Sequence, residues 1–255
     1  MQVFALTEIG KVRKDNEDSY LVSVERGLFS VADGMGGYAG GQVASSIAIR
    51  VLDQELPSQA VGVDADRNEG EALLAALQKA NKIILEQGRE EEYLGMGTTV
   101  TTALIADSRL WIAHIGDSRA YLCREGQVVQ LTQDHSLVNE LVQQGELTLE
   151  EAQNHPRRHV LTRALGVNEQ PEIDLRQLPV QEGDLLLLCT DGLYNQLNEG
   201  ELENILAQQE GSLQMKVENL VNLALERGGH DNITAVLVRY DCLDNSSPNH
   251  CAGKR

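Results

Sequence analysis

The sequence predicts an α+β domain built from antiparallel sheets. Short runs rich in Val, Ile and Leu, often separated by turn residues such as Asp107-Ser108, are typical of strands and occur in clusters. Segments with helical periodicity fall in pairs between these clusters, and strict alternation of strand and helix is absent. This order favours layered antiparallel sheets over a doubly wound parallel sheet.

Apolar runs and periodicity predict the individual elements. Helices are expected where apolar residues recur every three or four positions, as Leu73, Leu77 and Ile84 do. The expected helices are 41–55, 71–87, 136–144, 199–208 and 213–227. The expected strands are 3–7, 20–24, 28–32, 98–106, 109–115, 118–123, 127–131, 173–178, 185–190 and 233–240.

The chain of 255 residues is long enough to bury a substantial core. No linker or repeat divides residues 1–240, which we expect to form one domain. The polar segment 57–70 is predicted to be a surface loop. The tail 241–255 combines Ser, Asn, Pro and Gly without periodicity, so it is predicted to be disordered.

The charge excludes some classes of partner. The chain has 21 basic and 39 acidic residues, a formal net charge of −18. Such an excess argues against sequence-independent binding to nucleic acid or to an anionic membrane, because both need clustered Lys and Arg. Solubility is the simplest account of the acidity. The alternative is that some of the carboxylates are gathered to hold cations.

Other global features point to the cytoplasm. The first fourteen residues lack the basic start and apolar stretch of a signal peptide, and no run approaches the roughly 20 apolar residues that span a bilayer. The four cysteines are scattered without paired metal-ligand spacing, and buried free thiols explain those that lie in apolar runs. These cysteines are Cys123, Cys189, Cys242 and Cys251.

Four aspartates recur at the ends of apolar runs. Asp33 follows LFSVA, Asp191 follows LLLLCT, Asp117 follows WIAHIG, and Asp231 precedes ITAVLV. A single Asp-Gly is ordinarily a turn signal. The repetition favours another interpretation, in which neighbouring antiparallel strands bring the four carboxylates to one sheet edge. Hard oxygen ligands of this kind select Mg²⁺, Mn²⁺ or Ca²⁺.

The glycine-rich run 33–41 has a competing interpretation. Gly34, Gly36 and Ala39 resemble a dinucleotide-binding fingerprint, and Asp53 follows at nearly the right interval. That motif needs a second parallel strand ending at the acidic residue, whereas Asp53 falls inside a helical pattern. The glycines are better explained by a sharp turn and a close approach of the backbone to a bound ion or substrate.

A small basic island lies near the N-terminus. Lys11, Arg13 and Lys14 are followed at once by acidic and amide residues, Asp15 to Asp18. A solvated charged turn would explain the pattern. The functional alternative is an arginine whose planar fork holds a phosphate beside carboxylates that serve a metal.

Six motifs, in order, resemble those of the metal-dependent protein phosphatases of the 2C type, in particular the small single-domain bacterial members. They span residues 1–240 of this chain. The motifs are Arg13-Lys14-x-Asn16-x-Asp18, Val31-Ala32-Asp33-Gly34-Met35-Gly36-Gly37, Gly97-Thr98-Thr99, Gly116-Asp117-Ser118-Arg119, Thr190-Asp191-Gly192-Leu193 and Asp231-Asn232-Ile233-Thr234. The resemblance implies a four-layer αββα sandwich, in which helix pairs flank two antiparallel sheets.

The resemblance also implies a centre of two Mn²⁺ or Mg²⁺ ions in a cleft at one sheet edge. Asp33 would bridge the two ions, and Asp191 and Asp231 would complete the first site. The Gly34 carbonyl would join Asp33 at the second site, and Asp18, with Glu17 assisting, would act through metal-bound water. Asp117 matches the residue that holds a third, looser ion, and Arg13 matches the phosphate-binding arginine.

The activity implied is hydrolysis of phosphoserine and phosphothreonine by in-line attack of a metal-bridging hydroxide. Animal relatives place a general-acid histidine where this chain has Met35, so metal-bound water would protonate the leaving group here. The insertion 134–166 matches a mobile flap beside the cleft, and Arg157, Arg158 and Arg163 give it basic character.

The expected partners are phosphorylated proteins, including Ser/Thr kinases, and the expected state is a cytoplasmic monomer. The alternative function is a catalytically silent module that binds metal and phosphoprotein. Every expected metal carboxylate is present, which weakens that alternative. We expect no partner of nucleic acid or membrane type.

Overall fold

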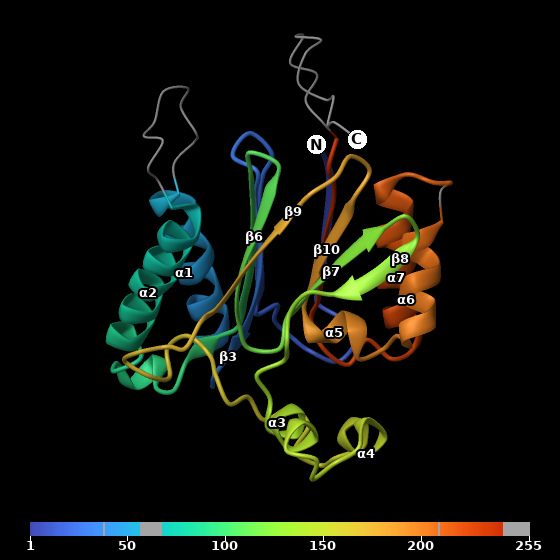
Figure 1. Ribbon diagram of the computed structural model, residues 1–255. Coiled ribbons are helices and arrows are strands. Elements are labelled where there is room, and N and C mark those ends of the chain that lie inside the picture. Colours follow the sequence, from blue (N-terminus) through green and yellow to red (C-terminus); the bar gives the residue numbers. More distant parts are fainter. Residues whose placement is uncertain (38, 57–67, 209, 242–255) are drawn as a thin grey trace.

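Two antiparallel sheets packed face to face form the centre of the computed structural model, which describes residues 1–37, 39–56, 68–208 and 210–241 (Figure 1). All strand pairs within the two sheets are antiparallel. The predicted α+β class with antiparallel sheets is confirmed. The predicted loop 57–70 and tail 241–255 lie largely outside the described residues.

The first sheet places the N-terminal strand beside the strand that comes last in the described chain. Its order is β1 (Gln2–Glu8), β11 (Ile233–Arg239), β10 (Leu185–Cys189), β7 (Arg119–Arg124) and β8 (Gln127–Gln130). β11 lies between β1 and β10 and is antiparallel to both, so the end of β1 lies beside the start of β11. The segment that leaves β1 toward Asp18 and the segment that leads into β11 therefore lie at the same edge of the sheet.

The second sheet holds the other early motifs. Its order is β2 (Asp18–Ser23), β3 (Leu28–Met35), β5 (Val100–Ala106), β6 (Arg109–Ile115) and β9 (Asp174–Pro179), and the short β4 (Gly97–Thr98) pairs with the end of β3. The turn Gly116 to Ser118 carries the chain from β6 in this sheet to β7 in the first.

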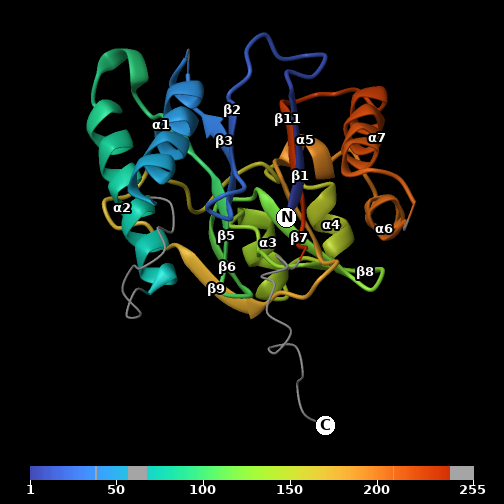
Figure 2. The same ribbon diagram turned by 90° about the horizontal axis from the view of Figure 1, so that it is seen from above.

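Helix pairs cover both outer faces. In Figure 1, α1 (Gly40–Glu55) and α2 (Glu69–Gln87) flank the second sheet on the left, and α6 (Glu199–Ala207) and α7 (Leu213–Glu226) flank the first on the right; Figure 2 shows the same order from above. Three apolar clusters fill the three interfaces, with Leu77, Leu188 and Leu220 as fully buried examples. The four-layer αββα sandwich is therefore confirmed.

Short helices lie at the cleft end of the sandwich. α3 (Leu137–Gln143) and α4 (Leu149–Gln153) belong to the flap, residues 134–166, which projects below the sheets in Figure 1. α5 (Asp191–Tyr194) follows β10 directly, and a 3₁₀ turn covers Glu91–Tyr93.

Several boundaries differ from the prediction. Asp33 lies within β3 instead of after it, because pairing with β4 extends the strand to Met35. The predicted strand 98–106 is interrupted at Thr99, between β4 and β5. The end of the predicted loop is already helical, since the Asn68 side chain caps α2. α4 and α5 were not predicted.

The described part of the chain contains no helix that is both long and apolar enough to cross a bilayer. Cys123 and Cys189 are buried free thiols, as predicted.

A buried histidine pair joins the second sheet to the flap. The rings of His114 in β6 and His135 lie 4.8 Å apart. His114 Nδ1 contacts Thr101 Oγ1 at 2.9 Å, and its Nε2 contacts the Gln133 carbonyl at 3.0 Å. Burial, with a contribution from His135, lowers the pKa of His114 to about 4.

His114 is expected to make folding stability fall with acid. The unfolded chain takes up the His114 proton near pH 6.5, whereas the folded chain does so only near pH 4. The contribution is therefore fully present above pH 6.5 and is lost between pH 6.5 and 4, by up to about 3 kcal/mol. Denaturant titrations of wild type and His114→Gln should diverge in slope across this window. Parallel pH dependences would contradict a neutral buried His114.

Candidate metal centre

Both sheets contribute carboxylates to one end of the sandwich. Asp18 and Asp33 are cross-strand partners in the second sheet. Asp191 is the first residue of α5 after β10, and Asp231 precedes β11, so both belong to the first sheet. The four aspartates that the sequence analysis expected at one edge, Asp33, Asp117, Asp191 and Asp231, all line one cleft.

Two threonine hydroxyls orient Asp18. Thr190 Oγ1 donates to Asp18 Oδ2 at 2.8 Å, and Thr234 Oγ1 donates to the same oxygen at 2.6 Å. The other oxygen, Oδ1, is buried and has no hydrogen-bond partner in the described chain. Asp18 therefore has one oxygen held by the protein and one buried oxygen without a partner among the described residues.

The backbone around Asp33 is fixed from the β4 side. The Asp33 carbonyl accepts from Thr99 N at 2.9 Å and from Thr98 Oγ1 at 2.9 Å, and Asp33 N donates to Thr99 Oγ1 at 3.0 Å. A Cβ at Gly34 would lie 2.0 Å from the Gly41 carbonyl oxygen. Only glycine permits this approach of β3 to the start of α1, so the close contact at Gly34 is with another backbone segment, whereas the sequence analysis expected one with a bound ion or substrate.

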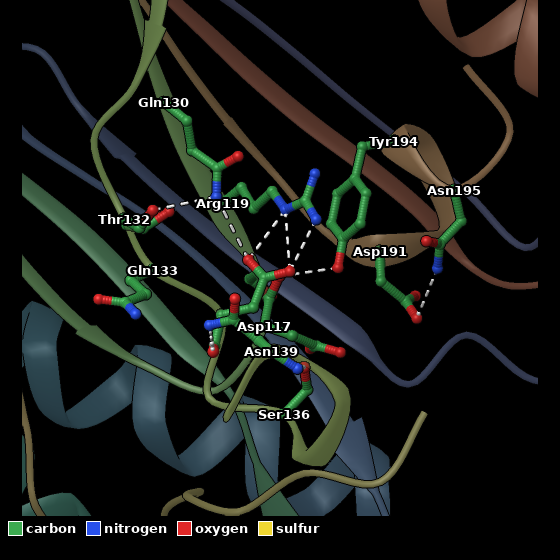
Figure 3. Close-up of polar contacts among 12 residues, drawn as sticks. Asp117, Arg119, Gln130, Thr132, Gln133, Ser136, Asn139, Asp191, Tyr194 and Asn195 are labelled. Atoms are coloured by element: carbon green, nitrogen blue, oxygen red, sulfur yellow. Dashed lines mark hydrogen bonds and ion pairs between the residues drawn. The ribbon is translucent and has the colours of Figure 1, made fainter. Parts of the chain in front are cut away.

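Asp191 and Asp231 are held side by side by close backbone packing. A Cβ at Gly192 would lie 1.9 Å from the Asn232 carbonyl oxygen, so α5 and the start of β11 touch directly. Asn195 Nδ2 donates to Asp191 Oδ2 at 3.1 Å, whereas Asp191 Oδ1 is buried and has no partner among the described residues (Figure 3).

Burial and mutual repulsion disfavour negative charge at this centre. Burial raises the pKa of Asp18 to about 7 and, together with the charge of Asp231, that of Asp191 to about 6. Burial, Asp18 and Asp191 raise the pKa of Asp33 well above its ordinary value. Burial and Asp191 do the same for Asp117. Bound cations would stabilise such a cluster, because their positive charge compensates carboxylates that are buried away from water and close to one another.

The donor set fits hard divalent cations. Most of the candidate ligand atoms are carboxylate oxygens, and the Gly34 carbonyl follows Asp33 directly. Asp18 and Asp191 each have one buried oxygen without a partner among the described residues, and a bound cation would compensate these buried charges. In the described chain, no three His, Cys, Asp or Glu side chains are already arranged as one complete metal site. Asp231 instead forms an ion pair with Arg13, at 2.8 Å from Nη2.

The loop that carries Arg13 is tied to the start of β11 by Asn232. Asn232 Nδ2 donates to the carbonyls of Ile9 and Asp15, both at 3.0 Å, and Asn232 Oδ1 accepts from Glu17 N at 2.8 Å. Arg13 reaches the cleft from this loop with about half of its side chain exposed. This guanidinium is therefore held close to the carboxylates and accessible from solvent.

A cleft of about 1690 Å³ extends from the carboxylates under the flap. Arg13, Asp33, Asp117, Asp191 and Asp231 all line it. From the flap side, His159 Nδ1 lies 4.0 Å from Asp191 Oδ2 and Arg158 also faces the cleft. Arg163 also lines the cleft, and it pairs with Glu172 and Asp174.

Several supporting residues were quoted in the sequence motifs without a role. Thr190, Thr234 and Asn232 act through the hydrogen bonds described above, and their positions beside motif aspartates were the available signal. Tyr194 lies outside the motifs. It stacks on Arg119 and donates to the Asp117 carbonyl, a contact that no local pattern reveals.

Comparison with known proteins identifies the family. The sequence model of the protein phosphatase 2C family matches residues 11–237 of this chain. A serine/threonine phosphatase, Stp, of Listeria monocytogenes is 42% identical over 239 residues, which cover 92% of this chain and 94% of the relative. This chain belongs to the protein phosphatase 2C family.

Solved structures agree with this assignment. The serine/threonine phosphatase PstP/Ppp of Mycobacterium tuberculosis superimposes with a TM-score of 0.86 at 36% identity, covering 94% of this chain and 98% of that one. The catalytic domain of the phosphatase PstP in complex with two manganese ions gives a TM-score of 0.82 at 37% identity, covering 92% of this chain and 96% of that one. The predicted function, that of a metal-dependent Ser/Thr phosphatase, is confirmed.

Proposed function

We propose that the cleft is the active site of this Ser/Thr phosphatase and removes phosphate from phosphoserine and phosphothreonine in proteins. The proposal is carried by two buried oxygens, Asp18 Oδ1 and Asp191 Oδ1, that have no partner among the described residues and that accompany Asp33, whose pKa burial raises. A cleft with this composition attracts divalent cations first. The cations then make the cleft attractive to a phosphate monoester.

We assign the metal ligands from the resemblance of the motifs to those of the 2C-type phosphatases. Asp33 would bridge two Mn²⁺ or Mg²⁺ ions. Asp191 and Asp231 would complete one site, the Gly34 carbonyl would belong to the other, and Asp18 would act through water. Asp117 would hold a third ion at the edge of the cleft. When bound, the ions supply an activated water for in-line attack and positive charge opposite the phosphoryl oxygens.

The residues of the chain bind and orient the substrate. Arg13 offers a planar fork for two phosphoryl oxygens, and Asn232 holds its loop in place. Met35 lines the cleft at the position of the animal general acid and has no proton to donate. Protonation of the leaving oxygen therefore does not come from the side chain at position 35.

A direct assay tests the function. Purified protein, stripped of metal and then supplied with Mn²⁺ or Mg²⁺, should hydrolyse a phosphothreonine peptide and p-nitrophenyl phosphate, and chelation should abolish turnover. Absence of turnover with either ion would favour the silent binding module. The same assay on autophosphorylated Ser/Thr kinases tests the proposed partners, and size-exclusion chromatography with light scattering tests the proposed monomer. Fractionation of the source cells tests the proposed cytoplasmic location.

Arg13→Ala should chiefly raise KM for phosphopeptide. Loss of a charge-assisted contact to phosphate predicts an increase of about tenfold, since Arg13 is half exposed. Lys14→Ala, in the same loop, is the matched control and should leave KM close to that of wild type. Steady-state kinetics at saturating Mn²⁺ measure both. An unchanged KM for Arg13→Ala would remove Arg13 from the phosphate site.

A further inference from the structure

Arg119 forms a fully engaged ion pair with Asp134 in the wall of the cleft. Arg119 Nε donates to Asp134 Oδ1 at 2.9 Å, and Nη2 donates to Oδ2 at 2.7 Å. Nη1 donates to the hydroxyl of Tyr121 at 3.0 Å. Each nitrogen of the guanidinium thus has a partner within the protein.

The same guanidinium orders Tyr194. The Arg119 Cζ atom lies 3.6 Å from the centre of the Tyr194 ring (Figure 3). The Tyr194 hydroxyl donates to the main-chain carbonyl of Asp117 at 3.0 Å. Arg119 therefore contacts the residue that holds the Asp117 turn.

Asp134 is the first residue of the flap and is fastened to it. Its carbonyl accepts from Asn139 Nδ2 of α3 at 2.6 Å. Its carboxylate also accepts from Gln130 Nε2 of β8 at 3.3 Å. The ion pair with Arg119 thus links the flap to β7 and, through Tyr194, to α5 and Asp117.

We infer that Arg119 is a positioning residue that couples the base of the flap to the Asp117 turn. A bidentate and stacked guanidinium holds three separate elements in one arrangement: Asp134 of the flap, Tyr194 of α5 and β7 itself. Lysine keeps the charge but can neither grip both carboxylate oxygens in this geometry nor stack in the same way. The inference rests on the proposed function only in assigning Asp117 to the metal centre.

The far end of β7 provides a matched control. Arg124 donates to Asp184 from Nε at 2.8 Å and from Nη2 at 2.6 Å, with an exposure similar to that of Arg119. This pair lies on the same strand but does not line the cleft. Arg124→Lys therefore removes a comparable bidentate pair without touching the flap or Asp117.

Hydrogen exchange of the metal-free protein tests the coupling without reference to activity. Arg119→Lys should accelerate exchange of the amides from His135 to Gln143 and of Ser118 by about tenfold, the expected effect of losing a charged hydrogen bond. Arg124→Lys should leave these amides unchanged. Wild-type protection of these amides in Arg119→Lys, or equal acceleration in Arg124→Lys, would overturn the inference.

Kinetics separate positioning from substrate contact. Arg119→Lys should lower kcat for p-nitrophenyl phosphate and leave KM nearly unchanged, because the guanidinium does not touch substrate. Tyr194→Phe removes only the hydroxyl bond to Asp117. It should lower kcat while the flap amides keep their protection. A rise in KM without loss of kcat in Arg119→Lys would reassign Arg119 to substrate binding. Because exchange is measured without metal, failure of the proposed function would leave that result standing.

Discussion

Asp33→Asn is expected to lower kcat by at least about 100-fold while making the metal-free protein more stable. We expect kcat to fall because asparagine lacks the negative charge of Asp33, the proposed ligand that bridges the two ions. The gain in stability follows from the raised pKa of Asp33, since a group whose folded pKa lies above its unfolded pKa destabilises the fold at neutral pH. Thermal unfolding in chelator should therefore give a higher Tm for the variant.

The difference in Tm between Asp33→Asn and wild type should change sign when metal is added. Mn²⁺ should raise the Tm of wild type through binding to the folded state and raise that of Asp33→Asn much less. Asp107→Asn, an isosteric change in the exposed turn between β5 and β6, is the control and should match wild type in both assays. Wild-type kcat in Asp33→Asn would exclude Asp33 from the centre. A fall in metal-free Tm would contradict the repulsion that we describe.

Gly192→Ala is expected to be strongly destabilising although it adds only one methyl group. The new Cβ would lie 1.9 Å from the Asn232 carbonyl oxygen, a backbone atom that cannot move without shifting β11. We expect a loss of about 3 kcal/mol or more in unfolding free energy, as for overpacked cores. Asp191 and Asp231 flank this contact, so metal affinity should fall in the fraction that folds.

Gly200→Ala is the matched control for this substitution. Gly200 lies in α6, and an added Cβ would meet only the Asn198 side chain, at 3.6 Å. Alanine favours helix, so this variant should gain about 0.5–1 kcal/mol. Urea denaturation of the two variants gives the comparison. If Gly192→Ala were as stable as wild type, α5 and β11 would have to be free to separate, contrary to the packing seen here.

Most of the fold could be predicted because the apolar runs are short, strong and separated by clear turns. The failures have local causes. α4 was missed although Thr148 and Glu151 form a capping box, a signal readable from the sequence. α5 has four residues, too few for helical periodicity. The extension of β3 through Asp33 depends on pairing with β4, a long-range contact that periodicity does not report.

The candidate site could be predicted residue by residue only where motifs carry it. The aspartates and Arg13 were found in this way, and the structure brings Arg13, Asp33, Asp117, Asp191 and Asp231 to one cleft. The ion pair between Arg13 and Asp231 was not foreseen, because their attraction depends on loops that are far apart in the chain. Likewise, Arg119 stood in a recognised motif, but its partners Asp134 and Tyr194 come from other elements.

The division of the carboxylates between the sheets has a mechanical consequence. Asp18 and Asp33 belong to one sheet, and Asp191 and Asp231 adjoin the other. A cation shared by Asp33 and Asp191 would act as a cross-link between the two halves of the sandwich, much as a disulfide joins two segments. Chelation would cut that cross-link at the cleft end alone, while the apolar contacts between the sheets hold the opposite end closed. The two sheets would then separate first at the edge that carries the carboxylates.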